Sequence, residues 1–326
     1  MGQARNPQRG PLVEGLNPVL VTGASGFAGR WMLRELADRG VATWAGVRRT
    51  GSVAGVPETI LDLDDPASIY TSLDKIRPRG IVHLAAMASP HLSNARPEAA
   101  YSVNFLGAER LLESCRVLGL APRILLVGSA TVYGKVGKAE LPLSETRPVR
   151  PADAYSLAKA AAEMLAPVYE PHFPVVVARS FNHTGPGQGT DFALPAFASQ
   201  IARIEAGLQE PVIRVGDLSA ERDFLDVRDV VAAYALLLEH GEATTTVNVC
   251  SGTCRPISEW LERLVSLARV PVRLEVDRSR VFEQSTPRLV GDNTRLRSLG
   301  WEPRISADSM LSFLLEHWRE RIHEAA

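Results

Sequence analysis

Short apolar runs alternate with longer amphipathic stretches through the first half of the chain. The amphipathic stretches have a helical period and cover residues 31–39, 66–75, 98–118 and 153–169. The apolar runs are rich in Val, Ile and Leu and predict strands at residues 18–21, 41–47, 59–63, 80–85, 123–127 and 174–178. Because these runs are continuous rather than alternating, both faces of the predicted sheet should be covered by helices. The pattern therefore predicts an α/β fold with a doubly wound parallel sheet.

The domain organisation follows from where this alternation stops. Residues 1–17 are polar and rich in Pro and Gly, without the apolar segment of a secretion signal, and are expected to form a disordered leader. Residues 18–180 carry the predicted sheet, and residues 181–326 mainly form a smaller second domain. The stretch 246–250 resembles a strand that returns to the sheet, so the two domains are expected to be interleaved. Pro167 is expected to kink or end the last of the four helices.

A glycine-rich turn, Thr-Gly-Ala-Ser-Gly-Phe-Ala-Gly, joins the first predicted strand to the first predicted helix. Gly23 allows a tight turn, Gly26 allows the backbone to approach a pyrophosphate, and Gly29 allows the helix to pack closely on the strand. The helix N-terminus and its backbone N–H groups favour an anion. The spacing is G-x-x-G-x-x-G rather than G-x-G-x-x-G, so the general fingerprint matches imperfectly. The turn predicts a Rossmann dinucleotide site lined by Gly23, Ser25, Gly26, Phe27, Ala28 and Gly29.

Tyr155 and Lys159 lie four residues apart in the last predicted helix, which places both side chains on one face. Lysine is rare in this chain, and the composition predicts roughly 0.07 chance occurrences of this spacing. A free tyrosine ionises near pH ~10, and a neighbouring ammonium lowers that pKa toward the range useful for proton transfer. The pair therefore predicts an acid–base site. The alternative is an ordinary surface lysine on an exposed helix.

Composition excludes several other classes of function. The net charge of −1 over 326 residues provides no overall basic field for nucleic acid. No apolar stretch approaches the ~20 residues of a membrane-spanning helix. Cys115, Cys250 and Cys254 make no disulfide framework and lack further clustered ligands for zinc. We therefore expect reduced thiols, no metal site and a cytoplasmic location.

Five sequence motifs follow one another between residues 19 and 301. They are Thr22-Gly-Ala-Ser-Gly-Phe-Ala-Gly29, His83-Leu-Ala-Ala86, Gly128-Ser-Ala-Thr-Val-Tyr-Gly134, the Tyr155 and Lys159 pair, and Arg222-Asp-Phe-Leu-Asp-Val-Arg-Asp229. As a set, these motifs resemble the extended short-chain dehydrogenase/reductase family. Within that family, Arg179-Ser-Phe-Asn-His-Thr-Gly-Pro-Gly-Gln188 and Val249-Cys-Ser-Gly252 are most similar to the GDP-6-deoxy-4-keto-mannose reductases, followed by the GDP-mannose dehydratases.

The resemblance implies a catalytic set of Ser129, Tyr155 and Lys159. In such enzymes the serine hydrogen-bonds the reacting carbonyl or hydroxyl, and the tyrosine exchanges the proton. Ser129 also follows an apolar strand, at the end where open α/β sheets bind ligands, although a serine that satisfies the local backbone is the structural alternative. Dehydratases of the family usually carry acidic residues directly after this serine, whereas this chain has Ala130 and Thr131. Dehydration is therefore disfavoured, which leaves ketone reduction, alcohol oxidation or epimerisation.

The cofactor type is predicted from Arg48 and Arg49, which follow the second predicted strand. An acidic residue there would favour NAD, whereas arginine accommodates the 2′-phosphate of NADP. NADP is therefore expected, with NAD or a merely solvated basic loop as the alternatives. The resemblance implies further cofactor-side positions, which are Asp62, Leu63, Ala85, Ala86, Asn104, Tyr155, Lys159 and Arg179. His83 is expected to be a structural strand residue.

The resemblance also implies a nucleotide-diphosphate sugar as the substrate. The candidate substrate residues are Ser89, Ser129, Asn182, His183, Arg222 and Arg280. Arg222 would bind the diphosphate or ribose; the alternative is a surface ion pair with Asp226. Near residues 277–287 the family usually carries an Arg-Pro-x-Asp clamp, but the residues that align there are Phe282, Glu283 and Ser285, so Arg280 is the nearest guanidinium. This departure leaves the base and the sugar open.

These expectations combine into one functional prediction, an NADP-dependent reductase of the 4-keto group of a nucleotide-linked 6-deoxysugar. A 4-epimerase with retained NAD is the alternative, and a non-catalytic dinucleotide-sensing scaffold is the alternative from another class. Helices 98–118 and 153–169 are rich in Ala and Leu and should be buried on a second side. In the resembled family such helices pair across a two-fold axis, so a homodimer is expected.

Overall fold

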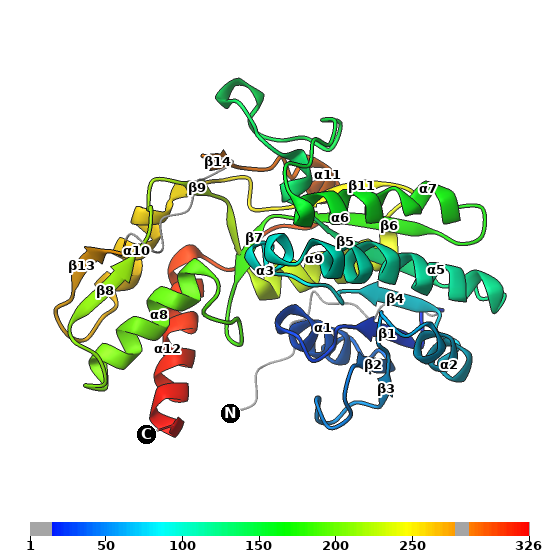
Figure 1. Cartoon of the computed structure of the whole chain (residues 1–326), viewed down its shortest axis with the longest axis horizontal. Coiled ribbons are helices and arrows are strands. Elements are labelled where there is room, and N and C mark those ends of the chain that lie inside the picture. Colours follow the sequence, from blue (N-terminus) through cyan, green and yellow to red (C-terminus); the bar gives the residue numbers. More distant parts are fainter. Residues whose placement is uncertain (1–14, 278–286, 326) are drawn as a thin grey trace.

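A computed structural model describes residues 15–277 and 287–325 of the chain. Within these residues seven parallel strands form one sheet, in the order β11-β6-β5-β4-β1-β2-β3 (Figure 1). The strands are β1 (Val19–Thr22), β2 (Thr43–Val47), β3 (Glu58–Ile60), β4 (Gly80–His83), β5 (Arg123–Ser129), β6 (Val175–Ser180) and β11 (Thr246–Val249). The predicted Rossmann sheet is confirmed, and β11 returns to pair in parallel with β6. Most of the predicted leader, residues 1–14, lies outside the described residues.

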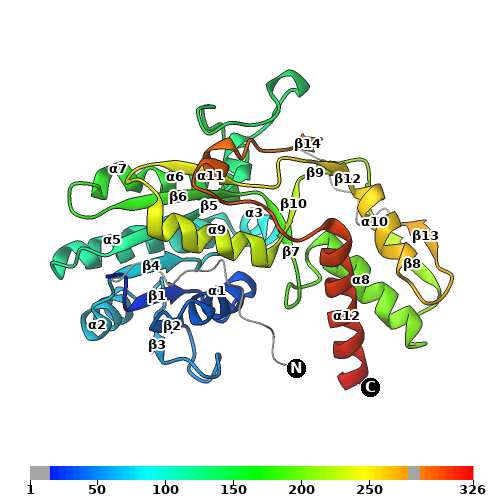
Figure 2. The same ribbon diagram turned by 180° about the vertical axis from the view of Figure 1, so that it is seen from behind.

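Helices cover both faces of the sheet (Figures 1 and 2). One face packs against α1 (Phe27–Asp38) and α9 (Val227–His240). The opposite face packs against α2 (Pro66–Ile76), α5 (Gly107–Val117) and α6 (Ala154–Glu163). Strand β1 shows how the sequence directs this arrangement, because its alternate side chains enter different cores. A strand that is covered twice therefore requires the continuous apolar run observed in the sequence.

Two of the predicted helices are interrupted. The first consists of α4 (Pro97–Tyr101), a π-helical turn at Ser102–Leu106, and α5. The second changes at Met164 from α6 to α7 (Leu165–Tyr169). Pro167 lacks the N–H that would extend the hydrogen-bond ladder across this junction, so the predicted break is confirmed.

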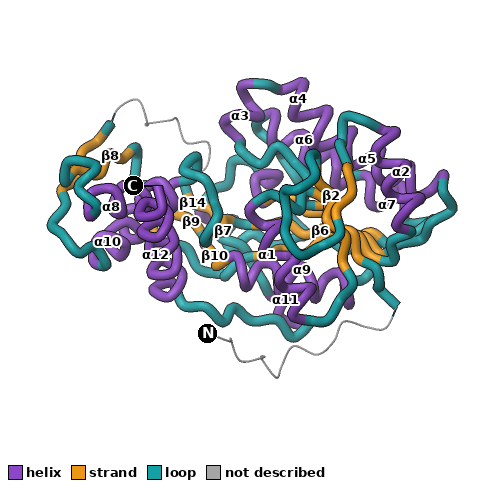
Figure 3. Tube along the Cα trace, turned by 90° about the horizontal axis from the view of Figure 1, so that it is seen from below, coloured by secondary structure: helices purple, strands orange, loops and turns teal. Residues whose placement is uncertain are grey.

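Several elements from the second half of the chain form a second group beside the sheet (Figures 1 and 3). Helices α8 (Ala193–Glu205), α10 (Ile257–Ser266) and α12 (Ala307–Ala325) share one hydrophobic core. The short strands of this region are β7 (Asn182–Thr184), β8 (Val212–Val215), β9 (Glu221–Arg222), β10 (Phe224–Asp226), β12 (Arg255–Pro256), β13 (Arg273–Val276) and β14 (Arg288–Leu289). The described part of the chain contains no helix with the length and apolarity that a membrane crossing requires.

Candidate active site

A cleft of about 1080 Å³ opens between the sheet and the second group of elements. Residues at the carboxyl ends of β1, β4, β5 and β6 line one side of the cleft, and the loop after β7 lines the other. The chain leaves β1 toward β2 on one side and returns through β4 on the other, so the cleft lies at the switch point where such sheets bind ligands. Its volume exceeds the ~300–1,000 Å³ of an ordinary small-molecule pocket.

Most of the predicted site residues line this cleft. They are Gly23, Ser25, Gly26, Phe27, Ala28, Gly29, Arg48, Asp62, Leu63, Ala85, Ala86, Ser129, Tyr155, Lys159, Asn182, His183 and Arg222. Residues from eight separate segments of the chain are thus gathered around one cleft.

The glycine-rich turn forms a cradle with no space for side chains. Gly23 has a φ of +67°, and a Cβ there would lie 2.7 Å from the backbone nitrogen of Ala85. A Cβ at Gly29 would lie 2.2 Å from the carbonyl oxygen of Gly23. Gly26 caps the N-terminus of α1 without a side-chain hydrogen bond, so the first backbone N–H groups of the helix face the cleft. This arrangement fits the pyrophosphate of a dinucleotide cofactor.

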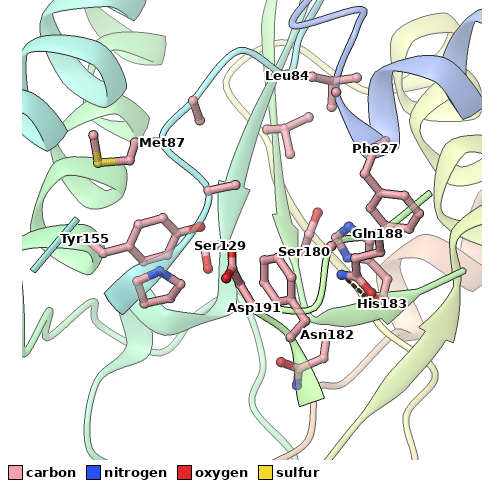
Figure 4. A pocket seen from close by; sticks show the side chains of 18 of the residues that line it. Phe27, Leu84, Met87, Ser129, Tyr155, Ser180, Asn182, His183, Gln188 and Asp191 are labelled. Atoms are coloured by element: carbon pink, nitrogen blue, oxygen red, sulfur yellow. Dashed lines mark hydrogen bonds between the residues drawn. The ribbon is translucent and has the colours of Figure 1, made fainter. Parts of the chain in front are cut away.

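The three predicted catalytic residues all line the cleft, and Figure 4 shows the Ser129 and Tyr155 side chains there. Ser129 ends β5, while Tyr155 and Lys159 occupy successive turns of α6, and each of the three side chains is about 8% exposed. Asp153 fixes the start of α6 because its side chain accepts the N–H of Ser156 at 2.8 Å. The Ser129 hydroxyl hydrogen-bonds the Thr131 hydroxyl at 3.0 Å. It also accepts the N–H of Thr131 at 3.3 Å, so Ser129 satisfies the local backbone and faces the cleft as well.

The ionisation of Tyr155 differs from the sequence-based expectation. Lys159 was expected to lower the pKa of Tyr155, but burial raises that pKa above 10, with the Ser129 hydrogen bond opposing the rise. The Lys159 ammonium donates instead to the Val127 carbonyl at 2.9 Å. Burial also lowers the pKa of Lys159 to about 8. Tyr155 is therefore protonated at neutral pH and suited to donate a proton.

His83 has a structural environment, as expected. Its Nδ1 lies 2.9 Å from the Thr22 hydroxyl, which joins the adjacent ends of β1 and β4. Burial, with a smaller contribution from the Lys159 charge, lowers the pKa of His83 to about 3. The ring is neutral at any ordinary pH and provides no proton for catalysis.

The loops after β2 and β3 form the far end of the cleft. Arg48 and Arg49 are both exposed, and Arg48 lines the cleft whereas Arg49 does not. The strand predicted at 59–63 ends at Ile60, because the Asp62 side chain accepts the N–H of Asp64 at 3.1 Å and turns the chain. This turn directs Asp62 and its neighbour Leu63 into the cleft.

Besides Arg49, three predicted residues do not line the cleft. Arg179 is buried below it and pairs with Glu163 at 2.9 Å, because a buried guanidinium requires an opposite charge. Asn104 lies in the π-helical turn. Its side-chain amide accepts a hydrogen bond from the N–H of Met87 and donates one to the Met87 carbonyl, so it orients Met87, which lines the cleft. Ser89 caps α3 (Pro90–Ala95).

The predicted substrate residues separate into two outcomes. Asn182, His183 and Arg222 line the cleft, and the His183 ring stacks on Phe27 with centroids 6.0 Å apart. The alternative pairing of Arg222 with Asp226 is wrong, because Asp226 binds Arg228 at 2.7 Å. Arg280 lies outside the described residues, as do Phe282, Glu283 and Ser285, which align with the family's Arg-Pro-x-Asp clamp.

Sequence reasoning named as site residues none of the cleft-lining residues between 188 and 197. They form the end of the Gly/Pro-rich loop that begins at Asn182 and the first residues of α8, and Figure 4 shows the Asp191 side chain among the side chains that line the cleft. The signal for this loop was the Gly-Pro-Gly-Gln sequence at 185–188, which breaks regular structure. Arg214 and Asp217, beside Arg222, were also missed. Among the described residues, no cluster of His, Cys, Asp or Glu has the arrangement of a metal site.

Comparisons with known proteins find similar sequences and structures among enzymes named for GDP-linked sugars. A model of the GDP-mannose 4,6-dehydratase family matches residues 20–313. GDP-6-deoxy-D-mannose reductase of Pseudomonas aeruginosa is 36% identical over 309 residues, which cover 94% of this chain and 98% of that protein. GDP-6-deoxy-D-talose 4-dehydrogenase of Aggregatibacter actinomycetemcomitans is 29% identical over 308 residues, with coverages of 94% and 98%. The structure of RMD from Pseudomonas aeruginosa complexed with NADPH superposes with a TM-score of 0.82 and 33% identity, covering 94% of this chain and all of that one.

Proposed function

Because the chain belongs to the GDP-mannose 4,6-dehydratase family, within the extended short-chain dehydrogenases/reductases, we propose that it reduces the 4-keto group of a GDP-linked 6-deoxysugar. NADP is the cofactor, and its reduced form supplies the hydride. The observation that carries this proposal is the buried set of Ser129, Tyr155 and Lys159. The two residues that follow Ser129, Ala130 and Thr131, carry no carboxylate. Such a set suits hydride and proton exchange at one carbon, whereas elimination of water needs a further acid–base group.

The residues of the cleft divide the reaction into simple steps. Ser129 donates a hydrogen bond to the ketone oxygen and holds it beside the Tyr155 hydroxyl. As C4 accepts the hydride, negative charge develops on that oxygen, and the proton of Tyr155 moves to it to complete the alcohol. The ammonium of Lys159 stabilises the phenolate that remains, and solvent then returns a proton to Tyr155. Burial of all three side chains strengthens these interactions.

The nucleotide sugar occupies the half of the cleft formed by the second group of elements. Asn182, His183 and Arg222 line this part of the cleft. Arg222 keeps its guanidinium in place by donating to the carbonyl of Glu221 at 2.9 Å. A guanidinium held in this way suits a diphosphate, since it binds phosphate oxygens with fixed geometry.

A product assay tests the proposed reaction. The purified protein is mixed with NADPH and GDP-4-keto-6-deoxymannose, and the products are identified by NMR. We expect stoichiometric oxidation of NADPH and a GDP-6-deoxyhexose with a new hydroxyl at C4. Interconversion of C4 epimers without net NADPH consumption would support the epimerase instead. Loss of water from GDP-mannose would support a dehydratase, and either outcome would overturn the reductase.

A homodimer is a further part of this proposal. Leu157, Met164 and Val168 are 47%, 54% and 64% exposed and lie on one face of α6 and α7. Leu106 and Val117 form a similar exposed pair along the neighbouring α5. Two such helices from each of two subunits bury these side chains in a two-fold helix bundle.

Replacing Leu157 and Val168 with Lys should convert the dimer to a monomer, because four charges would enter the bundle of the assembled pair. Light scattering across a dilution series should fall from twice 35.4 kDa to 35.4 kDa. Leu208→Lys is the matched control, since Leu208 is 50% exposed but lies in the second group of elements. A wild-type protein that is monomeric at every concentration would contradict the proposed assembly.

A further inference from the structure

Glu163 is a buried carboxylate one helical turn beyond Lys159 on α6. The residue is 5% exposed. Its Oε2 accepts a hydrogen bond from Arg179 Nε at 2.9 Å, and Nη2 of the same guanidinium lies 2.9 Å from it in an ion pair. Its Oε1 is also buried and has no hydrogen-bond partner among the described residues. A buried carboxylate oxygen without a partner is costly to maintain, so this side chain requires an explanation beyond the ion pair.

The unpartnered oxygen points toward β5, the strand whose Val127 carbonyl accepts the Lys159 ammonium. A Cβ at Gly128 would lie 2.6 Å from Oε1, so the carboxylate fills the space that a side chain on β5 would occupy. The carbonyl of Val127, one residue earlier on the same strand, accepts the Lys159 ammonium. Glu163 and Lys159 therefore approach the same short segment of β5 from the same face of α6.

Arg179 is held in turn by a rigid set of contacts. Its guanidinium lies over the Tyr133 ring, 4.8 Å from the centroid. The Tyr133 hydroxyl donates to the Asn248 side chain on β11 at 2.7 Å. Burial raises the pKa of Glu163, and the charge and hydrogen bond of Arg179 oppose that rise. The ion pair thus holds the Glu163 carboxylate in place beneath the catalytic lysine.

We propose that Glu163, oriented by Arg179, is a positioning residue that keeps the ammonium of Lys159 charged beside Tyr155. The proposal rests on the proton transfer assigned to Tyr155, because that step needs a cation next to the phenolate. Burial favours the neutral amine, and the carboxylate counteracts this effect. In a medium of low dielectric constant, one nearby opposite charge changes such an equilibrium by about tenfold.

The surroundings of Lys159 supply little other negative charge. The titratable groups near it come from α6, β4, β6 and α9. They are Tyr155 and Glu163 on α6, His83 on β4, Arg179 on β6, and Tyr234, which faces Tyr155 from α9. His83 is neutral, because its pKa is about 3, and burial raises the pKa of both tyrosines. The opposing charge is therefore that of Glu163.

The direction of the expected effect follows from the sign of this charge. Burial lowers the pKa of Lys159 to about 8, and Glu163 acts to raise it. Replacing Glu163 with Gln removes the negative charge while keeping the shape and an acceptor for Arg179. The pKa of Lys159 should then fall below 8, so that most of the lysine is neutral at pH 8. The basic limb of the pH profile of kcat/KM should move to lower pH by about one unit, a tenfold change in the ionisation constant.

The small number of lysines allows a direct test that does not depend on turnover. Protein labelled with ¹³C at lysine Cε gives signals from Lys75, Lys135, Lys138 and Lys159 only, and Lys159→Arg identifies the fourth. NMR titration should give a lower midpoint for Lys159 in Glu163→Gln than in wild type, by about one unit. Glu163→Asp should restore most of the difference. A midpoint that stays within about 0.3 units of wild type would overturn the proposal.

Glu205→Gln is the matched control, because Glu205 is also a buried partner of an arginine, Arg319 at 2.6 Å, but lies between α8 and α12. It should lower stability without moving the Lys159 midpoint. If Glu163→Gln does not fold, the paired replacement of Glu163 and Arg179 by Met removes both charges and carries the same expectation. If the Lys159 midpoint shifts as expected in Glu163→Gln but the product assay shows no reduction of the keto sugar, only the proposed function is refuted. An unchanged midpoint with a successful assay would refute only the role of Glu163.

Discussion

Tyr155→Phe is expected to lower kcat by about 10² or more while leaving the fold and cofactor affinity nearly intact. The substitution removes only the hydroxyl that donates the proton, and positioned acid–base groups typically contribute 10²–10⁴-fold. The phenyl ring retains the packing of a side chain that is already about 92% covered, because Tyr155 is 8% exposed. The measurement is the steady-state rate of NADPH oxidation with the keto sugar, accompanied by a fluorescence titration of NADPH.

Tyr169→Phe provides the control for this substitution. Tyr169 is similarly buried and its hydroxyl donates to Glu113 at 3.3 Å, but it lies at the end of α7 outside the cleft. Its loss should cost about 1 kcal/mol of stability and little activity. Steady-state rates near wild type for Tyr155→Phe would show that Tyr155 is not the proton donor. An equal fall in the rates of both variants would indicate a general loss of folding.

The sheet could be predicted because its strands coincide with continuous apolar runs in the sequence. Every residue of β6, Val175–Ser180, is buried, and such a run has few alternatives to a doubly covered strand. The ends of the elements were less predictable, since they depend on single side chains. β3 stops before Asp62 because of one turn-forming hydrogen bond. The π-helical turn at Ser102–Leu106 leaves no apolar signature, because its residues keep the helical pattern on either side.

The site shows a similar limit. The spacing of Tyr155 and Lys159 placed both side chains on one face of a helix, but spacing does not report how much water each side chain loses. Burial therefore reversed the expected direction for the pKa of Tyr155. Arg179 was assigned to the cofactor from its motif, whereas a carboxylate on a different element neutralises it in the core. Contacts between distant segments of the chain require the fold, so charges that pair across elements are the least visible part of a site.

The arginines after β2 give the second large expected effect. Arg48→Ala should weaken NADPH binding by about 10- to 100-fold and leave NADH binding nearly unchanged, because only NADPH carries the 2′-phosphate and a charge-assisted hydrogen bond contributes about 1.5–3 kcal/mol. Arg48 lines the cleft, whereas its exposed neighbour Arg49 does not. Arg49→Ala is therefore the matched variant, with the same change of charge at the adjacent position and a smaller expected loss.

Calorimetric titration of both coenzymes into each variant separates specific recognition from general attraction. A contact with the phosphate should produce a loss that is confined to NADPH and that persists at high salt better than a long-range effect, because direct pairs are screened less than separated charges. Equal losses for NADPH and NADH in the Arg48 variant, or equal losses in both arginine variants, would mean that this loop supplies only a diffuse positive field. The choice of NADP would then have to come from elsewhere in the cleft, and Ser25 in the glycine-rich turn would be the next position to replace.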